Sequence, residues 1–467
     1  MASNNVIVIA VVAVVAVAAV AGALVLTNNG GDKVDTKLSD VRFALQILGN
    51  ANEDTVIDNT DVVIIEKIIS GELKYEDYPY ADANNDKQIT DADLDLVKKL
   101  KDRVSGTTAY VVNTDSRSSD SAQTITKVTY PLTKIVPYGV NIVEPIIAID
   151  GGRSVAAYFA SGYPVQEASM KGTDLKGGSR TIGDAAWERF LEADAATHFD
   201  CFILTYDARA QVTDTYYNDL VTAEIPVLCF PAASPDGEAD AALTIGFLLG
   251  GNSEKLGVKY ANIYNEVLDT IKDKVGSLTD SEKTVYLAMT MYTSICQNDS
   301  TYQLCGIASD GMPYNKVDET FANKYKGTSS TASTTVEALA NLNMQKIVNY
   351  RSMDQVSSAA DIKDAYVETF EYTNSKGVEL KALLQGSKLY NSTNDSLPGV
   401  YLINNTLPAP VRVAYTAAVL YDSLTFDWAK GIMQEFIDEK FTSFEGKNID
   451  QNIVTCFGYD DYKAAKA

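Results

Sequence analysis

The sequence predicts an α/β chain in which two lobes are joined by a long helix, preceded by a small all-α module and one N-terminal hydrophobic helix. Three observations carry this prediction. They are an uncharged apolar run over residues 6–26, two similar Asp- and Asn-rich segments that begin at Asn50 and Asp82, and short apolar runs that alternate with helical patterns after residue 133. Such alternation is typical of parallel sheets covered by helices. A length of 467 residues also indicates several domains.

The composition limits the classes of function. The formal net charge is −23, and so acidic a chain repels phosphate backbones, so we expect no nucleic-acid partner. The single histidine, His198, leaves a catalytic triad only one candidate base and rules out a multi-histidine metal site. Because no acid–base constellation can be assembled by spacing, the sequence predicts a binding protein and not an enzyme.

The apolar run at the N-terminus predicts a membrane anchor. A helix over residues 6–26 spans about 31 Å, the thickness of one hydrocarbon core. No basic side chain precedes the run, and it is longer than the apolar stretch of most secretory signals. We therefore predict that residues 1–30 are an uncleaved anchor with a short linker; a cleaved signal peptide is the alternative. The chain would be a single-pass protein of the cell membrane with its body on the extracytoplasmic side.

Residues 38–104 predict a calcium module. Segment 82–93 places oxygen-bearing side chains at positions 1, 3, 5 and 12 of a twelve-residue calcium loop, and position 7 would supply a backbone carbonyl. Its predicted ligands are Asp82, Asn84, Asp86, Gln88 and Asp93. The corresponding residues of segment 50–61 are Asn50, Asn52, Asp54 and Asp61. Because Asn50 carries no charge, we expect the first loop to bind weakly or not at all. The alternative is that both segments are Asx-rich turns that cap helices.

Both loops run into helical patterns, at residues 62–69 and 94–100. This loop–helix repeat, with Asp at the last loop position, resembles the EF-hand-like dockerin type I family. The glycine usual at loop position 6 is Thr55 in one loop and Lys87 in the other, so a sharp turn must form without glycine. The resemblance implies calcium as cofactor and a cohesin-type protein as a possible partner, with packing on the chain's own body as the alternative. Polar residues 113–123 predict a linker or an exposed hairpin tip after the module.

The remaining residues predict two α/β lobes, at 106–255 and 278–467, with the long helix at 252–277. In the first lobe, apolar runs at 135–136, 201–204 and 227–230 predict strands. Segments 143–149, 185–195 and 216–223 predict helices between them. Helical spacing over 256–275 predicts the long helix, and residues 284–289 predict the first strand of the second lobe.

The order of these elements resembles the periplasmic substrate-binding proteins for iron-siderophores, haem and cobalamin, which have two Rossmann-like lobes and a helical backbone. The matching pieces are 133–151, 182–184, 199–204, 245–251, 350–356 and 398–403. Each piece is degenerate, and their order carries the resemblance. It implies an ABC importer component that binds an iron chelate, haem or a corrinoid and docks on an ABC permease. The alternative is a cell-surface scaffold or adhesion protein that binds a cohesin-type partner through its dockerin-like module.

Loops at the carboxyl ends of strands line the sites of open α/β sheets. The residues predicted there are Tyr138, Gly139, Asn141, Tyr206 and Arg209 in the first lobe and Met291, Tyr292, Asn405 and Arg412 in the second. An anionic chelate would need Arg209 or Arg412 as its charge partner. The resemblance also implies one permease-docking acid per lobe, at Asp354 and, less clearly, at Asp214. Cys296 and Cys305 flank a polar loop and predict either a disulfide or two unpaired thiols.

Overall fold

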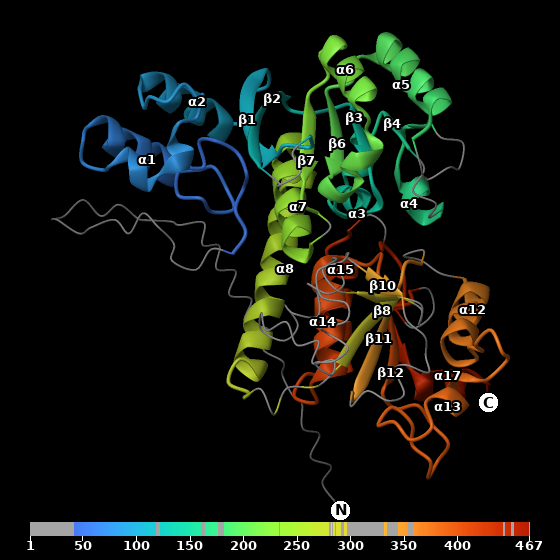
Figure 1. The fold of residues 1–467 in the computed structure, drawn as a ribbon. Helices are drawn as coiled ribbons and strands as arrows, with labels where there is room; N and C mark the ends of the chain where they lie inside the picture. The colour runs from blue at the N-terminus through green and yellow to red at the C-terminus, as the bar shows by residue number, and fades with distance from the viewer. Residues whose placement is uncertain are drawn as a thin grey trace, which may run out of the picture.

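The computed structural model describes most of the chain beyond residue 41. The described residues are 42–117, 122–159, 164–175, 182–232, 234–279, 282, 284, 286–290, 294–296, 331–333, 344–353, 358–441, 444–449 and 453–466. They form a small helical module, two α/β lobes and a long helix, α8 (Asn252–Val275), that runs alongside both lobes (Figure 1).

The module has the predicted loop–helix repeat. Its two helices are α1 (Asn59–Ile69) and α2 (Asp91–Lys101), with short 3-10 turns η1 (Tyr75–Asp77) and η2 (Pro79–Ala81) between them. Each helix begins with a capping box, formed by Asp58 with Asp61 and by Thr90 with Asp93. The last acid of each loop therefore also satisfies a free backbone N–H at the start of a helix.

The first lobe has a parallel sheet in the order β3-β6-β7, and the three predicted strands are confirmed. The strands are β3 (Ile135–Tyr138), β6 (Cys201–Thr205) and β7 (Val227–Phe230). The larger helices are α3 (Val140–Ala148), α5 (Asp184–Thr197), α6 (Asp214–Thr222) and α7 (Pro235–Leu249). The smaller elements are η3 (Gly151–Ser154), β4 (Ala157–Tyr158), α4 (Pro164–Ser169), β5 (Thr173–Asp174) and η4 (Tyr206–Gln211).

The second lobe has a mixed sheet in the order β10-β9-β8-β11-β12-β13, in which β8, β11 and β12 are parallel. The strands are β8 (Tyr286–Thr290), β9 (Ser294–Cys296), β10 (Thr331–Ser333), β11 (Lys346–Arg351), β12 (Val400–Asn404) and β13 (Cys456–Gly458). The helices are α12 (Ala359–Phe370), α13 (Leu380–Leu383), α14 (Ala409–Leu420), α15 (Phe426–Asp438) and α17 (Tyr459–Lys466). The long helix α8 contacts α7 of the first lobe and α14 of the second.

The module packs directly on the first lobe, and of the two alternatives predicted for residues 113–123, a linker or a hairpin tip, the hairpin is confirmed. Strands β1 (Thr107–Thr114) and β2 (Gln123–Tyr130) form an antiparallel hairpin that pairs Thr114 with Gln123, and of the residues between them the structure describes 115–117 and 122. Leu48 N–H donates to Tyr110 O at 2.9 Å, and Val112 N–H donates to Gln46 O at 2.9 Å. One continuous cluster of buried side chains includes module residues and the buried face of α8. The physical reason is that residues 43–48 are apolar enough to be buried against the hairpin and the helices.

The predicted single-pass membrane topology is corrected. Among the residues that the structure describes, no helix combines the length and apolar character needed to cross a membrane. The longest of them, α8, has charged side chains along its length, such as Glu254, Lys259 and Glu266. The predicted anchor, residues 6–26, lies outside the described residues. Cys305 also lies outside them, so the predicted pairing of Cys296 with Cys305 stays a prediction.

Candidate functional site

The second loop of the module folds its backbone around its acidic side chains. Asp82 accepts hydrogen bonds from Asp86 N–H at 3.1 Å and Lys87 N–H at 2.8 Å, and Asp93 Oδ1 accepts one from Asn84 N–H at 3.1 Å. Lys87, at the position where glycine is usual, has a φ of 69°. The sharp turn therefore forms with a left-handed lysine in place of glycine.

The first loop is the more deeply buried of the two. Asn50 is 0 % exposed, and its amide donates to Leu45 O at 3.0 Å and Asp54 O at 2.7 Å. Its Oδ1 has no hydrogen-bond partner. Burial raises the pKa of Asp61 to about 8. An orphaned buried amide oxygen and a buried carboxyl in one loop are groups that a cation would satisfy, because calcium takes carboxylate and amide oxygens as ligands.

Both loops therefore fit calcium by the chemistry of their donors. Among the described residues, no three His, Cys, Asp or Glu side chains are gathered closely enough to hold a metal ion by themselves. In each loop, the acids would have to act together with Asn side chains and backbone carbonyls, as in a mixed oxygen shell. The sequence missed the burial of Asn50, because it depends on how residues 45–54 fold around the Asn50 side chain.

The parallel strands of each lobe end at one edge of their sheet, and the residues after β12 contact the helix after β7 through Ala409 N–H and Glu238. We call the region at these two edges the interlobe edge. It is bordered by Gly139 and Asn141 after β3, by Arg209 after β6 and by Asn405 after β12. Gly139 has a φ of 109°, and a Cβ there would lie 2.8 Å from Thr205 Oγ1. Arg209 is half-buried, with its guanidinium carbon 3.7 Å from the centre of the Tyr206 ring.

Two predicted ligand residues point elsewhere. Tyr138 is 2 % exposed; its hydroxyl bonds Gln211, and its ring packs against Phe159 and Phe202. Arg412 is 4 % exposed and forms an ion pair with Glu238. The predicted residues Met291, Tyr292 and Asp354 lie outside the described residues.

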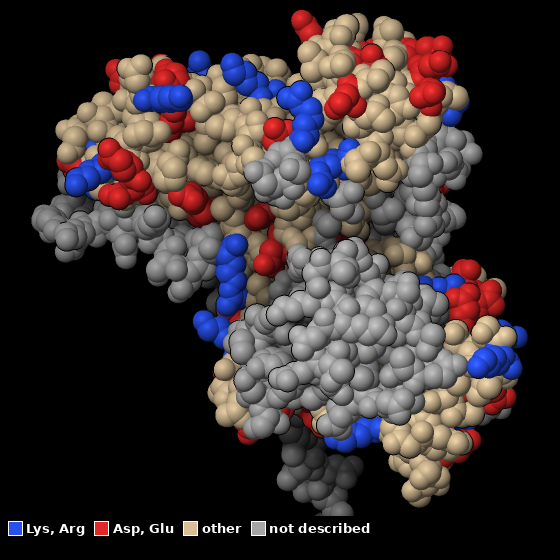
Figure 2. All heavy atoms as spheres, in the orientation of Figure 1, with Lys and Arg blue, Asp and Glu red and all other residues tan. Residues whose placement is uncertain are grey.

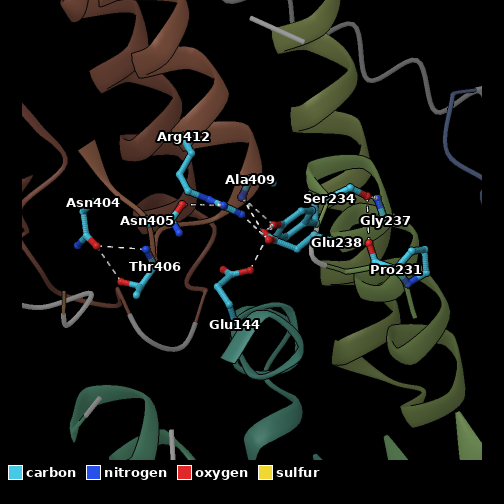
Figure 3. Close-up of polar contacts among 11 residues, drawn as sticks. Glu144, Pro231, Ser234, Gly237, Glu238, Asn404, Asn405, Thr406, Ala409 and Arg412 are labelled. Atoms are coloured by element: carbon cyan, nitrogen blue, oxygen red, sulfur yellow. Dashed lines mark hydrogen bonds and ion pairs between the residues drawn. The ribbon is translucent and has the colours of Figure 1, made fainter. Parts of the chain in front are cut away.

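Arg412 belongs to a buried group that we call the interlobe cluster: Glu144 of α3, Glu238 of α7, Tyr260 of α8 and Arg412 of α14. Figure 3 shows Glu144, Glu238 and Arg412 converging from three helices. Glu238 Oε1 accepts hydrogen bonds from the Tyr260 hydroxyl at 2.5 Å and from Ala409 N–H at 2.8 Å. A carboxylate of the first lobe thus caps the first turn of a second-lobe helix, which fixes the two lobes relative to each other.

The interlobe cluster is also hydrogen-bonded to a residue of the interlobe edge, Asn405. Arg412 Nη1 donates to Asn405 Oδ1 at 3.3 Å, and Asn405 N–H donates to Arg351 O at 2.9 Å. The neighbouring Asn404 accepts hydrogen bonds at Oδ1 from Thr406 N–H at 3.1 Å (Figure 3) and from Met353 N–H at 3.2 Å. The ends of β11 and β12 are therefore joined by hydrogen bonds. The sequence held one signal for the cluster: Glu144 is the one charged residue in a helix that is otherwise apolar except for Asn141.

A separate cavity of about 530 Å³ lies in the second lobe beside β13. Its lining includes Tyr401, Phe426, Cys456 and Phe457, with Asp427 at its border. None of the residues that border the interlobe edge belongs to this lining.

Comparisons with known proteins bear on both parts of the chain. The two-lobed body has the fold of periplasmic solute-binding proteins. The TroA-like periplasmic binding protein FepB from Veillonella parvula shares 14 % identity over 74 % of this chain and 99 % of its own, with a TM-score of 0.50. The nickel-bound CeuE of Helicobacter pylori shares 13 % identity over 73 % of this chain and 98 % of its own, with a TM-score of 0.45.

A third solved structure is the molybdate-bound MolA of Haemophilus influenzae, with 10 % identity over 71 % of this chain and 97 % of its own and a TM-score of 0.47. Residues 48–100 match the family model described as "Dockerin type I domain". The module that precedes the solute-binding fold is therefore a dockerin type I domain. No curated protein matches the chain significantly.

Proposed function

We propose that this chain is the solute-binding component of an ABC importer, and that its ligand is an iron chelate, haem or a corrinoid. One observation carries the proposal: Ala409 N–H donates to Glu238 Oε1 at 2.8 Å. This contact places the end of β12 beside the helix that follows β7, so loops at the carboxyl ends of both sheets border one region. Such regions are where open α/β sheets bind their ligands.

The proposed ligand contacts are the residues that border the interlobe edge: Gly139, Asn141, Arg209 and Asn405. Arg209 supplies the charge for an anionic chelate, because Arg412 is already paired with Glu238. Met291 and Tyr292, which follow β8 in the sequence, remain proposed contacts. For permease docking, Asp354 and Asp214 remain the proposed acids. Asp214 lies in an exposed acidic region over α5 and α6 that also includes Asp184, Glu188 and Glu192 (Figure 2).

Replacing Arg209 with alanine is expected to weaken binding of an anionic ligand about 10- to 100-fold, since a hydrogen bond to a charged group contributes roughly 1.5–3 kcal/mol. Isothermal titration with a ferric siderophore and with haem measures this effect. Arg117→Ala, in the β1–β2 turn, is the matched control and should bind as the wild type does. Equal affinity of the Arg209 variant and the wild type would exclude Arg209 as the charge partner.

The dockerin domain favours a second function, recruitment of a cohesin-type protein by a cell-surface scaffold. We propose calcium as its cofactor, held by the nine predicted loop residues: Asn50, Asn52, Asp54, Asp61, Asp82, Asn84, Asp86, Gln88 and Asp93. The two functions are compatible in one chain. Titration with a purified cohesin domain in calcium and in chelator tests this second function on its own, because none of the residues that border the interlobe edge belongs to the module.

A further inference from the structure

Glu144 lies in the interlobe cluster without a charge partner of its own. Its side chain belongs to the first lobe and is buried, with the residue 3 % exposed, and its Oε1 has no hydrogen-bond partner. The nearby carboxylate of Glu238 takes the ion pair with Arg412. One arginine balances one carboxylate. A second ionised carboxylate in this buried place would leave an unpaired negative charge, which is costly.

The hydrogen bonds around Tyr260 also indicate that Glu144 carries a proton. The Tyr260 hydroxyl lies 2.5 Å from Glu238 Oε1 and 3.3 Å from Glu144 Oε2. It has one hydrogen, which serves the closer, charged oxygen. Ala409 N–H already donates to the hydroxyl oxygen at 3.0 Å and to Glu238 Oε1 at 2.8 Å. With that hydrogen on Glu238, the 3.3 Å contact between Tyr260 and Glu144 is a hydrogen bond only when Glu144 supplies the hydrogen, as a neutral carboxyl group does.

The surroundings of Glu144 favour its neutral form. Burial and the Glu238 carboxylate raise the pKa of Glu144 well above its usual range, while Arg412 and Tyr260 act in the opposite direction. Helix α3 also contacts η3, α4, β3 and β6, and Arg153 of η3 is itself paired with Asp150 at 2.8 Å. The titratable or charged residues of those four elements are Arg153, Glu167, Tyr138 and Cys201, and α7, which also packs on α3, adds Asp236, Glu238 and Asp240.

We propose that Glu144 is a protonated positioning residue, and that its proton keeps the two lobes in register at the interlobe edge. The neutral acid sits beside Glu238 without repelling it, and Glu238 remains free to bind Arg412 and Ala409. When Glu144 loses its proton, two negative charges face each other between α3 and α7. The repulsion weakens the contacts of Glu238 with Ala409 N–H and Arg412 of α14. Because Arg412 also donates to Asn405, the position of Asn405 becomes less fixed. This inference does not depend on which ligand the chain binds.

The proton on Glu144 makes the stability of the folded chain fall as pH rises. The folded chain keeps a proton on Glu144 that the unfolded chain releases near its ordinary pKa of 4.5. The stabilising contribution is therefore complete below about pH 4.5 and is lost as pH rises toward the folded-state pKa. Over that interval the unfolding equilibrium constant of the wild type rises about tenfold per pH unit from this group alone.

Urea unfolding of the full chain and of Glu144→Gln, measured from pH 4.5 to 8 at fixed calcium, tests the proposal. The amide introduced by this substitution is neutral at every pH, so other titrating groups cancel in the comparison. We expect the ratio of the wild-type to the variant unfolding constant to rise about tenfold per pH unit. A ratio that does not change with pH would overturn the proposal, because it would mean that Glu144 titrates equally in both states.

Hydrogen exchange at Ala409 N–H in the wild type gives a second readout that needs no variant. After correction for the intrinsic exchange rate, its protection should fall as pH rises from 5 to 8, whereas protection that is constant over this range counts against the proposal. Glu238→Gln is the comparison variant. Because Glu238 is the ionised partner of Arg412, this variant should unfold more readily than the wild type at every pH. Equal stability would assign the charge to Glu144 and contradict the proposal.

Discussion

Arg412→Ala is expected to lower the free energy of unfolding by about 3–5 kcal/mol, the usual cost of leaving one partner of a buried ion pair alone. Arg412 and Glu238 are 4 % and 2 % exposed, so water cannot replace the lost partner. The loss should appear without any ligand, in urea unfolding followed by circular dichroism. It also removes the hydrogen bond from Arg412 to Asn405, so the interlobe edge should exchange hydrogen faster.

Arg209→Ala is the matched control for this prediction, because Arg209 is half-buried and its guanidinium stacks on the Tyr206 ring instead of pairing with a buried carboxylate. Its effect on unfolding should stay within roughly 0.5 kcal/mol. The two arginines are thereby assigned opposite roles, one to the interlobe contact and one to ligand binding. The reverse pattern, in which Arg412→Ala is stable and loses only ligand affinity, would restore Arg412 as the ligand contact that the sequence predicted.

Removal of calcium is expected to loosen the body as well as the dockerin domain. Residues 43–48 connect the two parts, because they contact both the first loop and the first lobe. Asn50 holds Leu45 O, Gln46 N–H donates to Thr244 Oγ1 at 3.1 Å, and the Phe43 ring stacks on Tyr264 with centroids 4.9 Å apart. Calcium at a hundredfold excess over its dissociation constant stabilises its site by about 2.7 kcal/mol. We expect chelation to reduce hydrogen-exchange protection in 109–112 and 240–247 together with 50–100.

Two variants separate the loops. Asp82→Ala with Asp86→Ala removes ligands of the more exposed second loop, and Asn50→Ala removes both the orphaned oxygen and two hydrogen bonds of the first. Both carbonyls keep a backbone donor, Ile47 N–H for Leu45 O and Leu45 N–H for Asp54 O, so the loss is that of two hydrogen bonds at roughly 0.5–1.5 kcal/mol each. Asn50→Ala should therefore deprotect residues 109–112 more than the double variant does. If the body amides keep full protection in chelator, the dockerin domain is energetically independent of the body, and the predicted coupling is wrong.

The regular elements were predictable because their causes are local. Short apolar runs at 201–204 and 227–230 predicted parallel strands, and the helical spacing over 256–275 predicted α8. The same holds for the two loops, where oxygen-bearing side chains recur at fixed spacing and the last acid caps the next helix. In all these segments, a residue's role follows from its neighbours in the sequence.

The rest could not be predicted, because it depends on which distant side chains meet. Arg412 was predicted to lie in a loop after the carboxyl end of a strand, where an unpaired arginine would favour ligand binding. In the structure it lies in α14. Its partner Glu238 lies in another lobe, and nothing near either residue indicates the pair. The sequence shows that residues 43–48 are apolar except for Gln46. Only the folded structure shows that they connect the dockerin domain to β1 through hydrogen bonds. Tertiary pairing thus decided both the interlobe cluster and the contact between module and body.

Hydrogen exchange of the full chain with a ferric siderophore, haem and cobalamin in turn tests the central claim most directly, with native mass spectrometry to confirm a bound ligand. The account predicts that one of these compounds binds and protects segments 139–142, 206–211 and 404–408 together, since these segments border the interlobe edge. Failure of all three compounds to bind, or protection confined to residues 453–461 beside the separate cavity, would contradict it.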